Sequence, residues 1–266
     1  EAMLQATSTQ NDLVLTFYLM TGIFFLLRYF AEMDLKSAIF SGIAFGLAVG
    51  TKFSFIYAVP GIGIGAAALF WNKRKTGHIY KSFSIWLFSV IAGILIFGSY
   101  IYIQNYIVWG FPLGPKEVMN YAADSGHKYF AFNILYVAYR FIDISGIPFV
   151  KIPRLSMSLH EDSGGYGALW LLLGVPAAYK ILRTIFLKDA RIGLLTLCGI
   201  GYLISFAYTT TVNMWILRLL LPVTAVFSPL VGYFYKPAGE QSYLQRVTYL
   251  FVVPLIGIVT VAVISF

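Results

Sequence analysis

The sequence predicts an all-α fold, a polytopic membrane helical bundle of about eight transmembrane helices, and three observations support this prediction. Of the 266 residues, 59% are hydrophobic and only 11% are charged, and the mean hydropathy is +0.78. Soluble domains carry about 25% charged residues, so the composition indicates a membrane protein. Apolar runs long enough to cross a bilayer recur along the chain, and the basic residues gather in short clusters between them. This distribution of the net charge of +8 excludes a nucleic-acid-binding protein.

The apolar runs divide into eight predicted spans. These are residues 12–30, 37–50, 53–71, 83–108, 167–186, 192–212, 214–235 and 247–266. The second span is short, and its junction with the third span at Thr51-Lys52 is tight. Gly42, Gly46 and Gly50 repeat in it at the spacing that lets helices approach closely, so we interpret them as packing residues. We expect residues 1–266 to form a single transmembrane domain.

The basic clusters predict the orientation of the spans. One cluster follows the third span (Lys73, Arg74, Lys75, Lys81), and another lies around the end of the fifth span (Lys180, Arg183, Lys188, Arg191). Loops rich in Lys and Arg stay in the cytoplasm. The N-terminal segment, the Thr51-Lys52 junction, the long loop 110–166 and the turn 209–213 are therefore expected on the exoplasmic side.

Residues 127–144, within the long outer loop, carry Arg140 and Asp143 among many aromatic residues. The segment is too short and too charged for a ninth span. We expect an amphipathic helix that lies in the membrane interface. Its lipid-facing side chains would be Tyr129, Phe130, Phe132, Tyr136, Tyr139 and Phe141.

Arg218 lies inside an otherwise apolar run, Met214 to Pro222. Placing an arginine near the middle of a bilayer costs roughly 2.5–3.5 kcal/mol, so such a residue is a candidate site for an anion. The alternative is a purely structural ion pair. Either way, the expected partner is Asp12, Glu161 or Asp162 near the outer surface, or an anionic ligand.

Other polar residues are expected at the same outer face. Asn11-Asp12 opens the first span, where Asp12 can cap the helix, contact a ligand, or do both. Lys52 ends the second span, where it can extend to the interface or reach a phosphate.

The stretch His160-Glu161-Asp162, with the glycines before Tyr166, leads into the fifth span. It can hold a metal or a sugar, or it can be a solvated turn. Cys198 is a single cysteine in an apolar run, and the sequence has no Cys/His spacing typical of a metal site.

Residues 6–15, ATSTQNDLVL, and residues 41–52, SGIAFGLAVGTK, resemble the middle of GT-C glycosyltransferases of the protein mannosyltransferase and aminoarabinose transferase type. Members carry a polar segment ending in Asp-Leu or Asp-Ala at the outer start of a helix, followed further along by Gly-x-x-x-Gly-Leu-Ala-x-x-x-Lys. The outer loop with Glu161 and Asp162, and the Arg-Leu-Leu-Leu-Pro run at Arg218, are similar to later parts of bacterial members.

The resemblance implies an enzyme that transfers a sugar from a polyprenyl-phosphate donor to an acceptor glycan, lipid or protein at the exoplasmic face of a plasma or inner membrane. Asp12, Glu161 and Asp162 would be candidate catalytic residues, and Lys52 and Arg218 would bind the donor phosphate. Asn11, His160 and Tyr166 are further candidates for substrate binding. No cofactor is firmly predicted, and a divalent metal stays an open alternative. Because the principal catalytic acid of the family lies upstream of these motifs, the chain is expected to be a fragment that is inactive alone.

The main alternative is a transporter or flippase for an anionic or lipid-linked substrate, which would use the same buried charge. The sequence shows no matching pair of interrupted spans, which favours the transferase. A structural or assembly subunit is a third alternative, in which the charges only mediate helix pairing.

Overall fold

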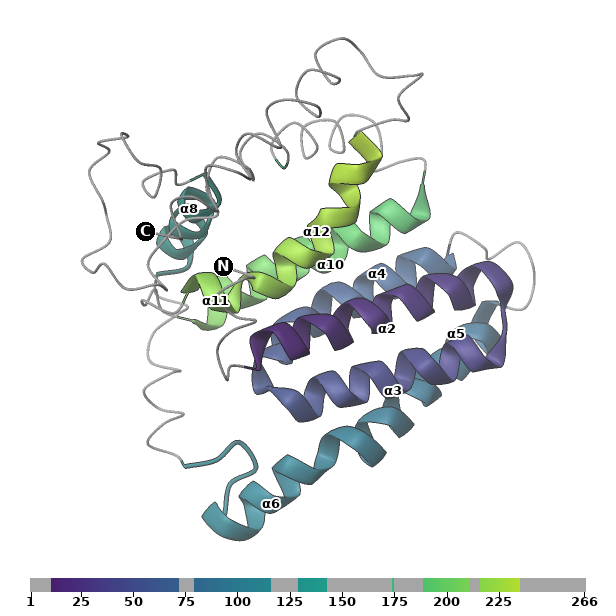
Figure 1. Cartoon of the computed structure of the whole chain (residues 1–266), viewed down its shortest axis with the longest axis horizontal. Coiled ribbons are helices and arrows are strands. Elements are labelled where there is room, and N and C mark those ends of the chain that lie inside the picture. Colours follow the sequence, from purple (N-terminus) through teal and green to yellow (C-terminus); the bar gives the residue numbers. More distant parts are fainter. Residues whose placement is uncertain are drawn as a thin grey trace, which may run out of the picture.

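The computed structural model describes residues 11–71, 79–115, 129–142, 174, 189–210 and 216–234 (Figure 1). Every regular element in these ranges is helical, which confirms the all-α prediction for this part of the chain. The elements are α2 (Asp12–Glu32), α3 (Leu35–Thr51), η1 (Phe53–Ala58), α4 (Val59–Trp71), α5 (Ile79–Gly93), η3 (Ile94–Gly98), α6 (Ser99–Trp109), α8 (Phe130–Ile142), α10 (Ala190–Thr209), α11 (Ile216–Leu219) and α12 (Leu221–Phe234).

Four helical stretches in the described residues are long and apolar enough to cross a membrane. They are Asp12–Glu32, Phe53–Trp71, Tyr80–Trp109 and Ala190–Thr209. Helices α3, α8 and α12 are apolar but shorter. These helices fit a membrane protein, whereas the predicted total of eight spans is not confirmed. The predicted spans 167–186 and 247–266 lie outside the described residues, apart from the helical residue 174.

The predicted seventh span is not one helix, which corrects the prediction for residues 214–235. α11 ends at Leu219, and α12 begins after a turn at Leu220. Pro222 lies in the first turn of α12, and it has no N–H to donate to the Arg218 carbonyl as a continuous helix would require, which explains a break at this point. The third predicted span, residues 53–71, matches a candidate span of the structure, and its first part is the 3₁₀ segment η1 before α4.

Helix α3 occupies the middle of one layer, because it packs against α2 on one side and against α5 and η3 on the other (Figure 1). Helices α4 and α10 pack on each other, and α12 contacts both α10 and α2. The core face of α2 is formed by side chains at helical spacing that are at most 1% exposed, namely Leu15, Leu19, Ile23 and Leu26.

Glycines let the α3 and α5 backbones touch, as the Gly-x-x-x-Gly pattern predicts. A Cβ atom on Gly46 would lie 2.1 Å from the carbonyl oxygen of Gly93, so no side chain fits there. The π-helical segment η3 follows Gly93 directly, and Gly98 ends it. A Cβ on Gly98 would lie 2.8 Å from the Gly46 carbonyl oxygen. Gly93 and Gly98 therefore both face α3.

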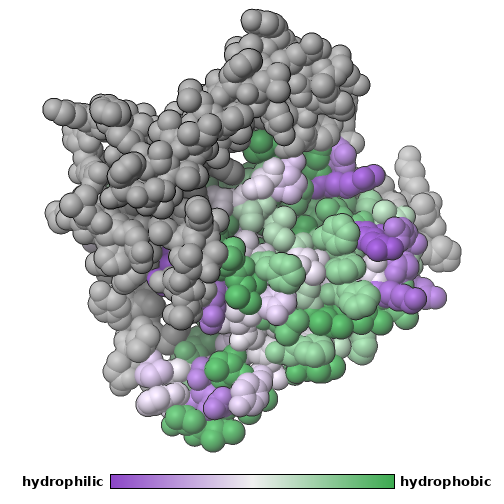
Figure 2. All heavy atoms as spheres, viewed as in Figure 1, coloured by the Kyte–Doolittle hydropathy of each residue, from purple (hydrophilic) through white to green (hydrophobic). Residues whose placement is uncertain are grey.

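The α2–α3 turn forms one end of the bundle. Met33 ends α2 in the left-handed conformation with φ 55°, and Asp34 caps α3 by accepting a hydrogen bond from the Ser37 N–H at 2.8 Å. The hydrogen bonds from Ser37 also hold the pKa of the Asp34 carboxyl below its ordinary value. Figure 2 shows hydrophilic side chains gathered at the right-hand edge of the view and mostly apolar side chains over the helices beside it.

Helix α8 falls within the predicted amphipathic segment 127–144 and packs against α10. The buried Asn133 amide donates hydrogen bonds to the carbonyl oxygens of Ala207 and Thr210, both at 2.9 Å. Of the six aromatic residues expected to face lipid, Tyr129 and Phe132 are more than half exposed, and the other four are only partly exposed. The interfacial position of this helix stays a prediction.

Candidate functional site

Asp12 forms the centre of a buried charge cluster built from three distant segments. The Lys52 Nζ atom lies 2.5 Å from Oδ1 of Asp12, and the Arg218 Nε atom lies 3.0 Å from Oδ2. The Asp12 side chain is only 1% exposed, whereas Lys52 and Arg218 are 27% and 19% exposed. We call Asp12, Lys52 and Arg218 the Asp12 cluster.

Asp12 is the first residue of α2, and the preceding residue Asn11 occupies the N-cap position. The Asn11 side chain makes no capping hydrogen bond and is exposed. Asp12 is therefore not the N-cap residue, although its carboxylate lies in the first turn of α2, where it pairs with two cations. The backbone of Asp12 is held locally, since the Thr16 hydroxyl donates to its carbonyl oxygen at 2.7 Å.

Lys52 lies at the C-cap of α3 with an extended backbone, φ −161° and ψ 135°. Its N–H donates to the Ala48 carbonyl, and its own carbonyl accepts from the Phe55 N–H at 3.1 Å. The backbone is thus tied both to α3 and to η1. Because α3 runs antiparallel to α2, the Lys52 side chain reaches the start of α2.

Arg218 lies in the last turn of α11, just before the break at Leu220. The buried Tyr202 of α10 donates a hydrogen bond from its hydroxyl to the carbonyl oxygen of Leu219 at 2.6 Å. This contact attaches the short helix that carries Arg218 to the longer α10. The guanidinium position therefore depends on the packing of α11 against the preceding helix α10.

A second contact joins the segment after Lys52 to the same helix. The Tyr57 ring of η1 packs edge-on against the rings of Tyr202 and Phe206, with centroids 5.7 and 5.4 Å apart. The Thr210 hydroxyl donates to the Tyr57 hydroxyl at 3.0 Å. Sequence reasoning missed both tyrosines, because a tyrosine in an apolar run resembles an ordinary core or interface residue.

One carboxylate and two cations leave the Asp12 cluster with a net charge of +1 when all three groups are ionised. The cations are the more exposed members, so they face any ligand that enters. Arg presents a planar fork of donors suited to phosphate or carboxylate, and Lys adds a compact charge. The Lys52 and Arg218 donors can therefore bind an anion such as a phosphate.

The remaining predicted site residues, His160, Glu161, Asp162 and Tyr166, lie outside the described residues. Within the described ranges, no three His, Cys, Asp or Glu residues gather as a metal site would require. Cys198 is buried and unpaired in α10.

The family of dolichyl-phosphate-mannose-protein mannosyltransferases matches residues 4–108, which is less than half of the chain. This match confirms the resemblance to GT-C mannosyltransferases over that segment, which includes Asp12 and Lys52. Arg218 lies beyond it. No curated protein and no solved structure matches the chain.

Proposed function

We propose that the chain is part of a membrane glycosyltransferase that moves a sugar from a polyprenyl-phosphate donor to an acceptor on the exoplasmic face. The family match over residues 4–108 supports a membrane glycosyltransferase with a donor of this kind. The observation that carries the finer proposal is the Asp12 cluster, in which Lys52 and Arg218 converge on one buried carboxylate. Both cations lie at the same end of the bundle, as a shared phosphate site requires.

In this proposal, Lys52 and Arg218 bind the phosphate of the lipid-linked donor. During transfer, the acceptor oxygen or nitrogen bonds to the anomeric carbon while the bond between that carbon and the phosphate oxygen breaks. The electron pair of the broken bond leaves with the polyprenyl phosphate, which gains negative charge. Cations placed at that oxygen stabilise the developing charge and so lower the barrier.

We assign Asp12 a positioning role within this mechanism. Its carboxylate is nearly inaccessible, and each oxygen already lies beside a cation. A general base must come within hydrogen-bond reach of the acceptor proton, which this placement disfavours. The base would then be another carboxylate, with Glu161 and Asp162 as the candidates that this chain offers.

The test replaces Arg218 with Ala in the intact protein and measures transfer from a labelled polyprenyl-phosphate sugar in membranes. We expect transfer to be abolished while the protein still inserts into the membrane. The matched control is Arg28→Ala, which removes an exposed arginine at the other end of α2 and should leave transfer unchanged. Full activity of the Arg218→Ala protein would contradict the phosphate role.

A transporter or flippase remains the second candidate, because the structure shows interruptions that the sequence did not predict. Helix α11 is broken from α12 beside Arg218, and the 3₁₀ segment η1 follows Lys52 directly. Interrupted helices beside charged residues are typical of substrate sites in transporters. Uptake of the labelled lipid-linked sugar into sealed vesicles without transfer to an acceptor would favour this candidate.

A further inference from the structure

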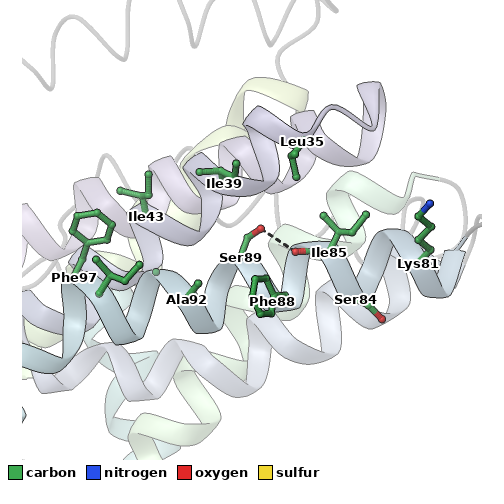
Figure 3. A pocket seen from close by; sticks show the side chains of 12 residues that line it. Leu35, Ile39, Ile43, Lys81, Ser84, Ile85, Phe88, Ser89, Ala92 and Phe97 are labelled. Carbon is green, nitrogen blue, oxygen red and sulfur yellow. Dashed lines mark hydrogen bonds between the residues drawn. The ribbon is translucent and has the colours of Figure 1, made fainter.

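An apolar groove of about 640 Å³ runs between α3 and α5 (Figure 3). Its lining residues come from the outer faces of these helices and from η3. They are Leu35, Ile39, Ile43, Lys81, Ser84, Ile85, Phe88, Ser89, Ala92, Gly93, Ile96 and Phe97. The groove is separate from the Asp12 cluster, whose residues do not line it.

Lys81 is the only charged residue among these lining side chains, and it lies at one end of the groove (Figure 3). The Ser89 hydroxyl is occupied by a hydrogen bond to the Ile85 carbonyl at 2.9 Å. The groove therefore has a long apolar wall and one cationic end. Among the described residues, no carboxylate lies within ion-pair distance of Lys81.

The cationic end lies at the opposite end of the bundle from the Asp12 cluster. Leu35 begins α3, whereas Lys52 follows its end. The Tyr29 hydroxyl, near the end of α2, donates to the carbonyl oxygen of Ser82, the residue after Lys81. Lys81 and the Asp12 cluster are therefore separated by about the length of α2.

We propose that this groove binds an anionic phospholipid, with one acyl chain along the apolar wall and the phosphate at Lys81. Lys81 to Phe97 lie within the candidate membrane span Tyr80–Trp109, so hydrocarbon chains surround this surface. An acyl chain matches the apolar lining, and a lysine at its end favours an anionic headgroup. The lipid occupies the leaflet opposite the Asp12 cluster, and the proposal does not depend on the proposed function.

The first experiment measures lipids retained by the intact protein in native mass spectrometry, using phosphatidylglycerol and phosphatidylcholine of identical chains. We expect the wild-type protein to retain phosphatidylglycerol in preference to phosphatidylcholine. Lys81→Ala should reduce this preference about fivefold, from the usual contribution of one lysine near an anionic surface. An unchanged preference in Lys81→Ala would overturn the proposal.

Two controls locate the site. Lys36 is exposed at the same end of the bundle but does not line the groove, so Lys36→Ala should keep the preference. Arg218→Ala should also keep it, because the donor phosphate is proposed to bind at the other end. A loss of preference in either control equal to that in Lys81→Ala would contradict a site in this groove.

A second pair of variants tests the apolar wall. Ala92→Trp fills the groove and should lower retention of both lipids, irrespective of their headgroups. Leu95→Trp is the matched control, because Leu95 is 64% exposed on the neighbouring η3 but does not line the groove. Equal retention by the two tryptophan variants would overturn the proposal even if Lys81→Ala folded poorly.

Discussion

Helix α2 carries an ion pair at each end, and the two pairs have the same separation but different surroundings. At its start, the Arg218 Nε atom lies 3.0 Å from the Asp12 carboxylate. Near its end, the Arg28 Nε atom lies 3.0 Å from the Glu32 carboxylate. The first pair joins distant segments around an acid that is 1% exposed, whereas the second joins residues four apart that are half exposed.

The comparison teaches that burial, rather than distance, decides what an ion pair contributes. Water and salt screen the exposed pair, and its partners are solvated even when apart. At the Asp12 cluster, removing the carboxylate leaves two cations without their shared partner in a poorly solvated place. Substitutions at the two ends of α2 should therefore have very different effects.

The largest effect is expected from Asp12→Ala, which leaves Lys52 and Arg218 facing each other without the carboxylate. We expect the free energy of unfolding to fall by about 3–5 kcal/mol, the usual cost of breaking a buried ion pair. Denaturant titration in detergent micelles measures this loss, with Glu32→Ala as the control at the other end. Equal effects of the two variants would contradict the role assigned to burial.

The next effect concerns the close packing of α3, the helix that ends before Lys52, against α5. Gly46→Ala inserts a Cβ against the Gly93 carbonyl, so α3 and α5 must separate, and we expect a destabilisation of about 1–3 kcal/mol. Gly63→Ala is the control, because its Cβ meets nothing within 4 Å. This control should be neutral or stabilising by about 0.5–1 kcal/mol, since glycine weakens helices. The same sign of change in both variants would refute the close packing.

A smaller effect distinguishes a role of Tyr202 in positioning Arg218 from a role in the stability of the bundle alone. Tyr202→Phe and Tyr29→Phe each remove one hydroxyl that donates to a backbone carbonyl, at opposite ends of the bundle. Both should lower the free energy of unfolding by about 1 kcal/mol. Only Tyr202→Phe should lower sugar transfer, because its partner Leu219 follows Arg218. Equal sugar transfer by the two variants would contradict a role of Tyr202 in positioning Arg218.

The smallest effect is expected from Arg28→Ala. The Arg28–Glu32 pair is exposed, and exposed pairs of this spacing contribute little. We expect no measurable change in melting temperature. A clear fall in melting temperature would show that distance alone predicts the contribution of an ion pair in this protein.

Part of the candidate site was predictable from sequence because polar residues are rare in apolar runs. Asp12, Lys52 and Arg218 were each identified in this way, and Asp12 was one of the three acids expected to pair with Arg218. The turn at Leu220 and the 3₁₀ segment after Lys52 were not predicted, since the apolar run continues through both positions. Tyr57 and Tyr202 were missed because their function depends on partners far away in the chain.

The sequence by itself determined that the protein is helical, apolar and suited to a membrane, because composition and the length of apolar runs reflect the surrounding solvent directly. It also determined where glycines permit close packing of α3. Only the tertiary structure decided that Asp12 lies between Lys52 and Arg218, because the antiparallel return of α3 and the Tyr202 contact bring these charges together. Local patterns specify which groups are costly to bury, whereas the packing of distant helices specifies which groups compensate that cost.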